Sequence, residues 1–331
     1  MEKLYPLLMK PLFDSRPWGR LDLSPIYSQN FEEKIGESWL TGDHCVVENG
    51  PLAGKSLAEL VAQYKRELIG EAPRDDHRFP LLLKFLFPQE KLSVQVHPDD
   101  EAAQEIGQPC GKTECWYVVH AEPGAEIGLG LKPGATRADF ECSIRDNRAE
   151  ELLNWIKVFP GDMIYVAGGT VHTLGPGLII VETQQQSDTT FRLYDYGRPR
   201  ALHLKDGLRV IKEGVRSGKV RPQAPRALNG NSSQQQRLVA SSYFSVEKYE
   251  LKSAQVFPAA YGKRSVRILV ATEGVATLRA DGCDPVTFKK GDAVVVPVSI
   301  ASFEVDPNPN VQFLKSYVPG VRVPDPEIVN L

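Results

Sequence analysis

Short apolar runs separated by glycine and proline are the feature that most restricts how this chain can fold. Its 331 residues include 27 Gly and 25 Pro, spread between short apolar runs along most of the length. Short runs bounded by turn residues are typical of strands. We therefore predict a mainly β fold with many turns.

Helical periodicity marks three segments, 54–70, 136–156 and 203–212. Two of them begin with the signature of a helix N-terminus. Ser56 is followed three residues later by Glu59, and Thr136 by Asp139, which is the spacing of a capping box. We expect a few helices in the N-terminal part of a chain that is otherwise built from strands.

Composition argues against several classes of protein. The net charge of −3 does not suit a nucleic-acid partner. No apolar run approaches the roughly 20 residues that span a bilayer, so we expect no membrane partner. The N-terminus lacks the apolar core and the cleavage site of a signal peptide. The 5 cysteines are scattered without a Cys-x-x-Cys pair, which is typical of reduced thiols and predicts a cytoplasmic protein.

Two short segments carry polar residues whose role the sequence leaves open. The run 79–87 is almost wholly apolar and predicts a buried strand, but Lys84 interrupts it. That lysine either extends its ammonium group to solvent or pairs with a buried anion. Glu37, Ser38 and Trp39 either line a pocket or place a buried aromatic ring beside a polar turn.

A strand with an unusual polar face lies in LSVQVHPDD, residues 92–100. Alternation along a strand places Ser93, Gln95 and His97 on one face. Pro98 ends the strand, and Asp99 is a suitable N-cap for a following helix. The hydroxyl, the amide and the imidazole therefore lie at a strand end, where a binding site is often built.

Two further stretches supply candidate partners for that face. In GKTECWYVV, residues 111–119, Lys112 and Glu114 are two residues apart and share a strand face. His172 follows a glycine-rich turn between two predicted strands. Two neutral imidazoles, a carboxylate and an amide oxygen can complete a four-ligand zinc shell. The alternative is that each histidine is an ordinary hydrogen-bonded residue.

The chain also contains an internal sequence repeat, and this repeat predicts the domain boundaries. Residues 161–172 align without a gap with residues 291–302, so that Ser302 takes the position of His172. A second pair of similar segments aligns Trp116 with Ile268. We predict a catalytic domain at 1–215, a linker at 216–236 and a degenerate copy at 237–331 that lacks the candidate ligands.

Taken together, these motifs carry a family resemblance. The Gly-Asp turn followed by a histidine resembles the second metal motif of the cupins. LSVQVHPDD, GKTECWYVV, GGTVH (168–172) and SDTTFRLYD (187–195) resemble the type I phosphomannose isomerases in their short bacterial form, over residues 7–205. The resemblance implies two cupin-like β-barrel (jelly-roll) domains. Where that family carries a Pro-Ala-Gly turn, this chain reads Ala-Gly-Gly at 167–169.

The resemblance also implies a ligand set and a reaction. In that family a single zinc ion is held by residues that match Gln95, His97, Glu114 and His172 here. The implied reaction interconverts mannose 6-phosphate and fructose 6-phosphate, a small sugar phosphate, through a cis-enediol.

Further site residues follow by matching the same motifs. Arg192 matches the family's catalytic arginine. Lys112 shares a strand face with Glu114 and can approach the substrate, whereas Ser93 and Arg198 are expected to bind the phosphate. The general base stays open between Lys112, a zinc-bound water and Asp195.

Two other functions compete with this one. His97, Glu114 and His172 also form the two-histidine, one-carboxylate set of iron-dependent cupin oxygenases. A non-catalytic sugar-binding cupin would share the fold without the reaction. Gln95 as a fourth ligand and the surrounding basic residues favour the isomerase over the oxygenase. The intact set of four ligands together with Arg192 argues against the non-catalytic cupin.

Overall fold

The computed structural model describes the whole chain except residues 1, 74, 76, 229–231, 259–263 and 330–331. Its described residues form three antiparallel sheets, and the chain is mainly β, as predicted. None of the three sheets closes on itself within the described ranges.

The first two sheets make up the N-terminal lobe. The seven-stranded sheet has the order β13 (Gly218–Lys219), β9 (Met163–Val166), β6 (Glu114–Ala121), β11 (Leu178–Gln185), β4 (Leu81–Leu86), β3 (Asn30–Trp39) and β2 (Leu12–Asp22). The five-stranded sheet has the order β12 (Phe191–Tyr194), β5 (Val94–Val96), β10 (His172–Leu174), β7 (Glu126–Leu131) and β8 (Leu153–Lys157). An apolar cluster with members from both sheets fills the space between them.

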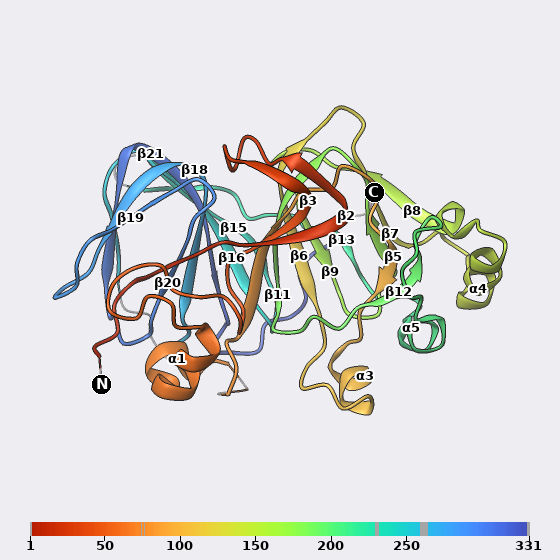
Figure 1. The fold of residues 1–331 in the computed structure, drawn as a ribbon, viewed down its shortest axis with the longest axis horizontal. Helices are drawn as coiled ribbons and strands as arrows, with labels where there is room; N and C mark the ends of the chain where they lie inside the picture. Colours follow the sequence, from red (N-terminus) through yellow and green to blue (C-terminus); the bar gives the residue numbers. More distant parts are fainter. Residues whose placement is uncertain (1, 74, 76, 229–231, 259–263, 330–331) are drawn as a thin grey trace.

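The nine-stranded sheet makes up the other lobe. Its main path is β1 (Leu7–Met9), β20 (Ala293–Val296), β18 (Arg267–Arg279), β21 (Phe303–Tyr317), β16 (Ser245–Leu251), β15 (Ser233–Ala240) and β14 (Arg226–Leu228). β17 (Gln255–Phe257) pairs with β21, and β19 (Val286–Lys289) pairs with β18. Figure 1 shows the two lobes side by side, the nine-stranded sheet on the left.

The two large sheets share one hydrophobic core. Tyr117 of β6, Ile268 of β18 and Leu314 of β21 are all buried in the same apolar cluster. Their strand neighbours face the other way, so Trp116 lies in the interior of the first lobe and Leu269 in that of the second. Because side chains alternate across a strand, one face joins the lobes and the other lines each lobe's own interior.

The internal sequence repeat is also a structural repeat, but the equivalent residues of the two sheets differ by one position from the sequence alignment. Read from β13 and from β1, the two large sheets run through equivalent strands in the same order. Trp116 pairs with Ile164, and Leu269 pairs with Val294. Ile164 and Val294 each lie three residues after the glycine of a Gly-Asp turn. Trp116 therefore corresponds to Leu269, and the predicted match with Ile268 was wrong.

The position of His172 is also shifted in the second copy. His172 begins β10 and pairs with Gln95, whereas Phe303 begins β21 and pairs with Phe257. The turn before the strand is one residue longer in the second copy. Phe303, and not Ser302, therefore takes the place of His172.

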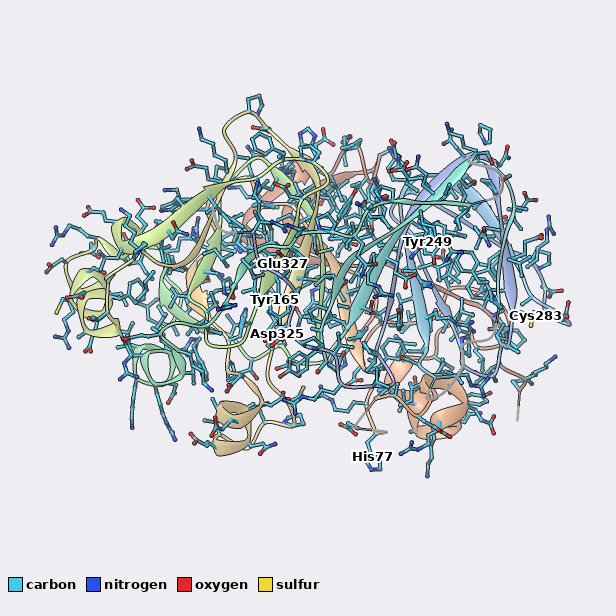
Figure 2. All side chains as sticks on the ribbon, turned by 180° about the vertical axis from the view of Figure 1, so that it is seen from behind. His77, Tyr165, Tyr249, Cys283, Asp325 and Glu327 are labelled. Carbon is cyan, nitrogen blue, oxygen red and sulfur yellow. The ribbon has the colours of Figure 1, made fainter. Side chains whose placement is uncertain are left out.

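The chain termini cross between the lobes. β1 near the N-terminus pairs with β20 of the second lobe. Near the other end, Asp325 accepts a hydrogen bond from Tyr165 of the first lobe, and Ile328 bridges to Val220. Figure 2 shows Tyr165, Asp325 and Glu327 close together on the rear side of the first lobe. The segment 216–236 contains β13, β14 and the first residues of β15.

The helices begin where the capping signals predicted but are shorter than expected. Both capping boxes are present, at α1 (Leu57–Tyr64) and at α4 (Arg137–Arg145). The predicted helix 54–70 is interrupted at Lys65, which has a φ of 47°, and resumes as α2 (Arg66–Ile69). Within 203–212 the structure has α5 (Leu204–Val210). None of the described helices has the length and apolar character needed to cross a bilayer.

The predicted helix 136–156 was wrong in its second half. After α4 the chain forms a 3₁₀ turn, η1 (Ala149–Leu152), and then enters strand β8. Pairing of β8 with β7 and burial of Leu153 and Ile156 outweigh the local helical pattern. α4 and α5 contribute to the apolar cluster on the outer face of the five-stranded sheet.

The shared core predicts that both lobes unfold together. Replacing the fully buried Ile268 by Ala should lower the free energy of unfolding by about 2–5 kcal/mol. All 4 tryptophans lie in the first lobe, at positions 18, 39, 116 and 155. Although Ile268 lies in the other lobe, tryptophan fluorescence should show the lower unfolding midpoint of the variant. The fluorescence transition should coincide with the transition seen by far-UV circular dichroism. Val256→Ala at an exposed position of β17 is the control, and two separate transitions would contradict the prediction.

Candidate metal centre

β5 is the strand on which the site is built. It lies between β12 and β10, and both Arg192 of β12 and His172 of β10 are register partners of Gln95. Directly paired residues project from the same face of a sheet, so these three side chains form a row. Val94 and Val96 pack on the opposite, outer face. The polar face predicted for this strand therefore points to the interior of the first lobe.

The strand end is held by tight backbone contacts. β5 itself spans only Val94–Val96, and Asp99 caps α3 (Asp100–Glu105) by accepting a hydrogen bond from Ala102, as predicted. The backbone of Gly169 donates to the carbonyl of His97 at 2.7 Å. A Cβ at Gly168 would lie 2.6 Å from the Cα of Asp99, so this turn requires glycine.

Three predicted ligands converge in the interior. One ligand atom from each of His97, Glu114 and His172 lies within 4.8 Å of the others, and all three side chains are buried. The Nε2 atom of His97 is 3.6 Å from one oxygen of Glu114, and that of His172 is 3.4 Å from the other. The site therefore presents two nitrogen atoms and a carboxylate toward one point.

Both histidines are oriented for metal binding through Nε2. The Nδ1 atom of His97 is 2.9 Å from the carbonyl of Thr189, and that of His172 is 3.0 Å from the carbonyl of Thr170. Since a carbonyl only accepts, each Nδ1 carries the proton and each Nε2 keeps its lone pair. Burial, with the nearby Lys112 charge, holds the pKa of His97 well below its usual range. Burial also lowers the pKa of His172 to about 4, so both rings are neutral at neutral pH.

Gln95 lies directly beside this group. Its Nε2 atom is 3.3 Å from Nε2 of His172, and its Oε1 accepts a hydrogen bond of 3.2 Å from Ser93. A half-turn of the amide exchanges these two atoms and presents the oxygen toward the histidines. The structure thus brings together all four residues that the sequence singled out.

The electrostatics of Glu114 suit a bound cation. Burial and the charge of Glu182 raise its pKa to about 7, against the lowering effect of Lys112. Neither Glu114 oxygen accepts a well-directed hydrogen bond among the described residues, although the Lys112 ammonium lies 3.0 Å from one of them. Lys112 also lies 3.1 Å from Nε2 of His97. A divalent cation would satisfy the buried oxygens and the two lone pairs together, so the residues fit a metal.

Sequence reasoning missed a second buried carboxylate behind the ligands. Glu182 of β11 accepts a hydrogen bond of 2.9 Å from Trp116, whose ring packs edge-on to His172 at 5.4 Å. The signal was available, because Glu182 has the same strand parity as the interior residues Leu178 and Ile180.

Lys84 pairs with buried anions, which answers the alternative that the sequence left open. Its ammonium group lies 3.0 Å from Glu37 and 3.4 Å from Glu182. Burial alone would raise the pKa of Glu37, but Lys84 and Arg16 outweigh it and lower that pKa to about 2. Glu37 therefore stays ionised inside the protein because two cations surround it.

The basic residues predicted for substrate have different environments. Arg192 donates to the carbonyl of Ala201 at 2.9 Å and keeps a buried Nε without a partner among the described residues. Burial and the charge of Arg200 lower its pKa. Arg198 is bound to Asp195 at 3.0 Å, and Arg200 contacts the same carboxylate at 2.7 Å. Asp195, one candidate for the base, is thus held by two arginines.

The fold and this site define a class of protein. A buried centre of two histidines, a glutamate and a glutamine, set in the interior of an antiparallel β lobe, is a candidate metal site of the cupin type. Comparison with known sequences makes the class specific. A model of the catalytic domain of type I phosphomannose isomerase matches residues 18–140. A model of the cupin domain of mannose-6-phosphate isomerase matches residues 234–318.

The chain belongs to the type I phosphomannose isomerase family. It is 36% identical to the mannose-6-phosphate isomerase ManA of Bacillus subtilis over 91% of this chain and 96% of that protein. It is 35% identical to the mannose-6-phosphate isomerase of Streptococcus mutans over 91% of this chain and 95% of the relative.

Solved structures agree with this assignment. A crystal structure of mannose 6-phosphate isomerase from Bacillus subtilis superposes with a TM-score of 0.82 and 31% identity, covering 94% of this chain and 99% of the other. A zinc-bound mannose 6-phosphate isomerase shares the fold, with a TM-score of 0.73 and 15% identity over 95% of this chain and 99% of the other.

The ion pairs of Glu37 predict a loss of stability in acid. A carboxyl whose folded pKa lies below its unfolded value stabilises the fold above the unfolded pKa, and this stability is lost as pH falls through the folded pKa. The fall in the pKa of Glu37 from 4.5 to about 2 contributes about 3 kcal/mol to the free energy of unfolding, at about 1.4 kcal/mol per pKa unit. Glu37→Gln should lower the unfolding free energy at pH 7 and flatten its fall between about pH 4.5 and 2. Denaturant titrations at each pH measure this, with exposed Glu33→Gln as the control; an unchanged acid slope would refute it.

The metal centre predicts selective loss of metal on removing one ligand. His172→Ala should weaken metal binding by more than about 100-fold, since even groups behind the ligands contribute about 10- to 100-fold. His120→Ala, on the exposed end of β6, should bind metal as the unmodified protein does. Elemental analysis after dialysis against chelator and reloading measures both. Equal metal content in the two variants would mean that the ion lies elsewhere.

Proposed function

We propose that this protein is a zinc-dependent isomerase that interconverts mannose 6-phosphate and fructose 6-phosphate. Family membership supports the reaction, since relatives at 36% and 35% identity carry this name. The observation that carries the proposal is the row His172–Gln95–Arg192, in which a cationic side chain is paired next to two proposed metal ligands on one sheet face.

Zinc suits the donor set of this site. Gln95, His97, Glu114 and His172 would hold one zinc ion per chain, with nitrogen and oxygen donors that zinc accepts in a four-ligand shell. When bound, the ion supplies Lewis-acid stabilisation of negative charge on the sugar oxygens. The zinc-bound structure of the same fold supports zinc over iron.

Arg192 is proposed to stabilise the charge that develops on O1 and O2 of the sugar. The reaction moves a proton between C2 and C1 through a cis-enediol, and negative charge accumulates on these oxygens. A guanidinium group stays protonated and can donate to two oxygens at once. The buried Nε of Arg192 has no partner among the described residues, so it can donate to a ligand.

Lys112 and Ser93 are proposed to contact the substrate from either side of the metal ligands. Lys112 already donates toward Glu114 and His97, so its ammonium group lies within the site. Ser93 hydrogen-bonds to Gln95 and is proposed to bind the phosphate. Arg198 is proposed as a further phosphate ligand, with its guanidinium oriented by Asp195.

The base is proposed to be Lys112 rather than Asp195. Asp195 makes ion pairs with Arg198 and Arg200, and a carboxylate held by two guanidinium groups is a poor proton acceptor. The Lys112 nitrogen lies within the proposed metal centre, 3.0 Å from Glu114, where it can reach the substrate.

The finer description of the fold belongs to the same proposal. Each lobe is proposed to be a cupin-like jelly-roll barrel, with the catalytic unit at 1–215 and the second copy at 237–331. The repeated strand order supports this division, with β1 exchanged into the second lobe and β13 into the first. A cytoplasmic location is proposed as well, supported by the free state of all five cysteines.

Arg192→Ala tests the function. The variant should keep its metal and lose about 10²–10³-fold in kcat, the usual effect of removing one charge-stabilising donor. A coupled assay of mannose 6-phosphate conversion, with elemental analysis of the same sample, measures both quantities. Arg145→Ala on the exposed face of α4 is the matched control and should keep full activity.

Two outcomes would overturn the proposal. Zinc-loaded protein without any conversion of mannose 6-phosphate would favour a sugar-binding cupin. Iron in the purified protein, with oxygen uptake in place of isomerisation, would favour the oxygenase.

A further inference from the structure

The second lobe contains a cavity that the isomerase reaction does not use. It has a volume of about 610 Å³, within the range of small-molecule sites. The residues along it that matter here are Arg226, Tyr249, Arg264, Arg267, Lys315 and Tyr317. Figure 2 labels Tyr249 in this lobe, apart from Tyr165 of the first. The position of the cavity in the repeat indicates what it binds.

Arg267 occupies the place that Glu114 holds in the first lobe. Glu114 pairs with Val166, and Arg267 pairs with Val296. Val166 and Val296 both lie five residues after the glycine of the Gly-Asp turn. A cation in the second copy therefore replaces the carboxylate ligand of the first.

The same exchange of sign occurs at the neighbouring strand. Trp116 pairs with Glu182, and its counterpart Leu269 pairs with Lys315. Lys315 thus takes the position of the second buried carboxylate. Two negative positions of the first lobe are both positive in the second.

The ion pair behind these positions is inverted as well. Glu182 pairs with Lys84 across β11 and β4, and Lys315 pairs with Glu247 across β21 and β16. The Lys315 ammonium group lies 2.9 Å from Glu247. Tyr249 and Tyr317 also donate to Glu247, at 2.8 and 2.9 Å. The single carboxylate on this side is therefore saturated, and the arginines set the net charge of the cavity.

Arg267 is already held in position to bind an anion. Its guanidinium lies 4.9 Å from the ring of Phe303, the counterpart of His172, and donates to the carbonyl of Ile300. Its buried Nε has no partner, and it makes no ion pair among the described residues. Burial and the charge of Arg264 lower the pKa of Arg267 to about 10, so the group stays charged at neutral pH.

The rest of the cavity supplies further charge and an apolar wall. Arg226 and Arg264 are exposed at the cavity and make no ion pair with other described residues. Phe257, the counterpart of Gln95, stacks on Phe303 at 4.8 Å and removes the polar ligands from this side. Together these groups form a cationic pocket with an aromatic wall.

We propose that the second lobe binds the phosphate ester of a small organic molecule directly, without a metal, with Arg267 as the anchor. Arg226 and Arg264 bind the outer phosphate oxygens, and the rings of Tyr249 and Tyr317 contact the organic part. The fold thus uses one barrel position twice, as a cation site in the first lobe and as an anion site in the second. The phosphate ester is either a sugar phosphate or a nucleotide.

Equilibrium dialysis with mannose 6-phosphate, adenosine monophosphate and inorganic phosphate tests this. Binding to the second lobe is measured as the ligand binding that the change Arg267→Met removes. Any binding in the first lobe is common to both proteins and cancels in this comparison. We expect at least one ester to bind about tenfold or more weakly to Arg267→Met, as for loss of a hydrogen bond to a charged group. The affected ester distinguishes a sugar phosphate from a nucleotide. Inorganic phosphate should bind more weakly, since it cannot contact the rings.

Controls separate this site from the isomerase reaction. Arg279→Met, an exposed change on the same strand, should bind as the unmodified protein does, and Arg267→Met should keep its isomerase activity. If Arg267→Met does not fold, the double change Arg226→Gln and Arg264→Gln at exposed positions should weaken the same binding. Binding of every probe unaffected by these changes, or no binding beyond the first lobe, would overturn the proposal.

Discussion

The alternation of side chains across the strands of two large sheets is the constraint on which this structure depends. One face of each sheet packs against the other sheet in a common apolar core. The opposite face lines the interior of one lobe. Because the shared core determines which residues of these strands face it, the alternate residues must face the interior of one lobe. Glu114 and Glu182 in one lobe, and Arg267 and Lys315 in the other, face inward for this reason.

Glu182 and Lys315 on those inward faces are tolerated because each has an opposite charge beside it. Lys84 lies between Glu37 and Glu182, and Lys315 lies against Glu247. An isolated buried charge would be strongly unfavourable, whereas a paired one can be kept at modest cost. Arg267 makes no ion pair among the described residues and is held by the carbonyl of Ile300 and the ring of Phe303. Glu114 has Lys112 3.0 Å away, yet its pKa is still raised to about 7. A site that leaves a carboxylate in this state is suited to a bound cation.

The repeat also places different side-chain chemistry on one scaffold. The strand order, the Gly-Asp turns and the pairing register are kept, and the chemistry changes at a few inward positions. Aromatic residues Phe257 and Phe303 stand where Gln95 and His172 stand in the first lobe. Function therefore depends on a small set of side chains placed on a common backbone frame.

The sequence by itself determined the mainly β class, the helix starts and the identity of the four candidate ligands. These follow from local signals, namely turn residues, capping boxes and strand parity, together with a family resemblance carried by short motifs. The candidate metal centre could be predicted because its residues lie at strand ends, where spacing alone predicts a shared face.

Only the tertiary structure decided which long-range partners each residue has. Residues 153–157 form a strand because they pair with β7. Lys84 forms ion pairs with carboxylates on β3 and β11, which are distant in the sequence. The turn before β21 is one residue longer than the turn before β10, so Phe303 takes the place of His172. A shift of one residue turns a side chain from one sheet face to the other, so only strand pairing could identify Arg267 as the counterpart of Glu114.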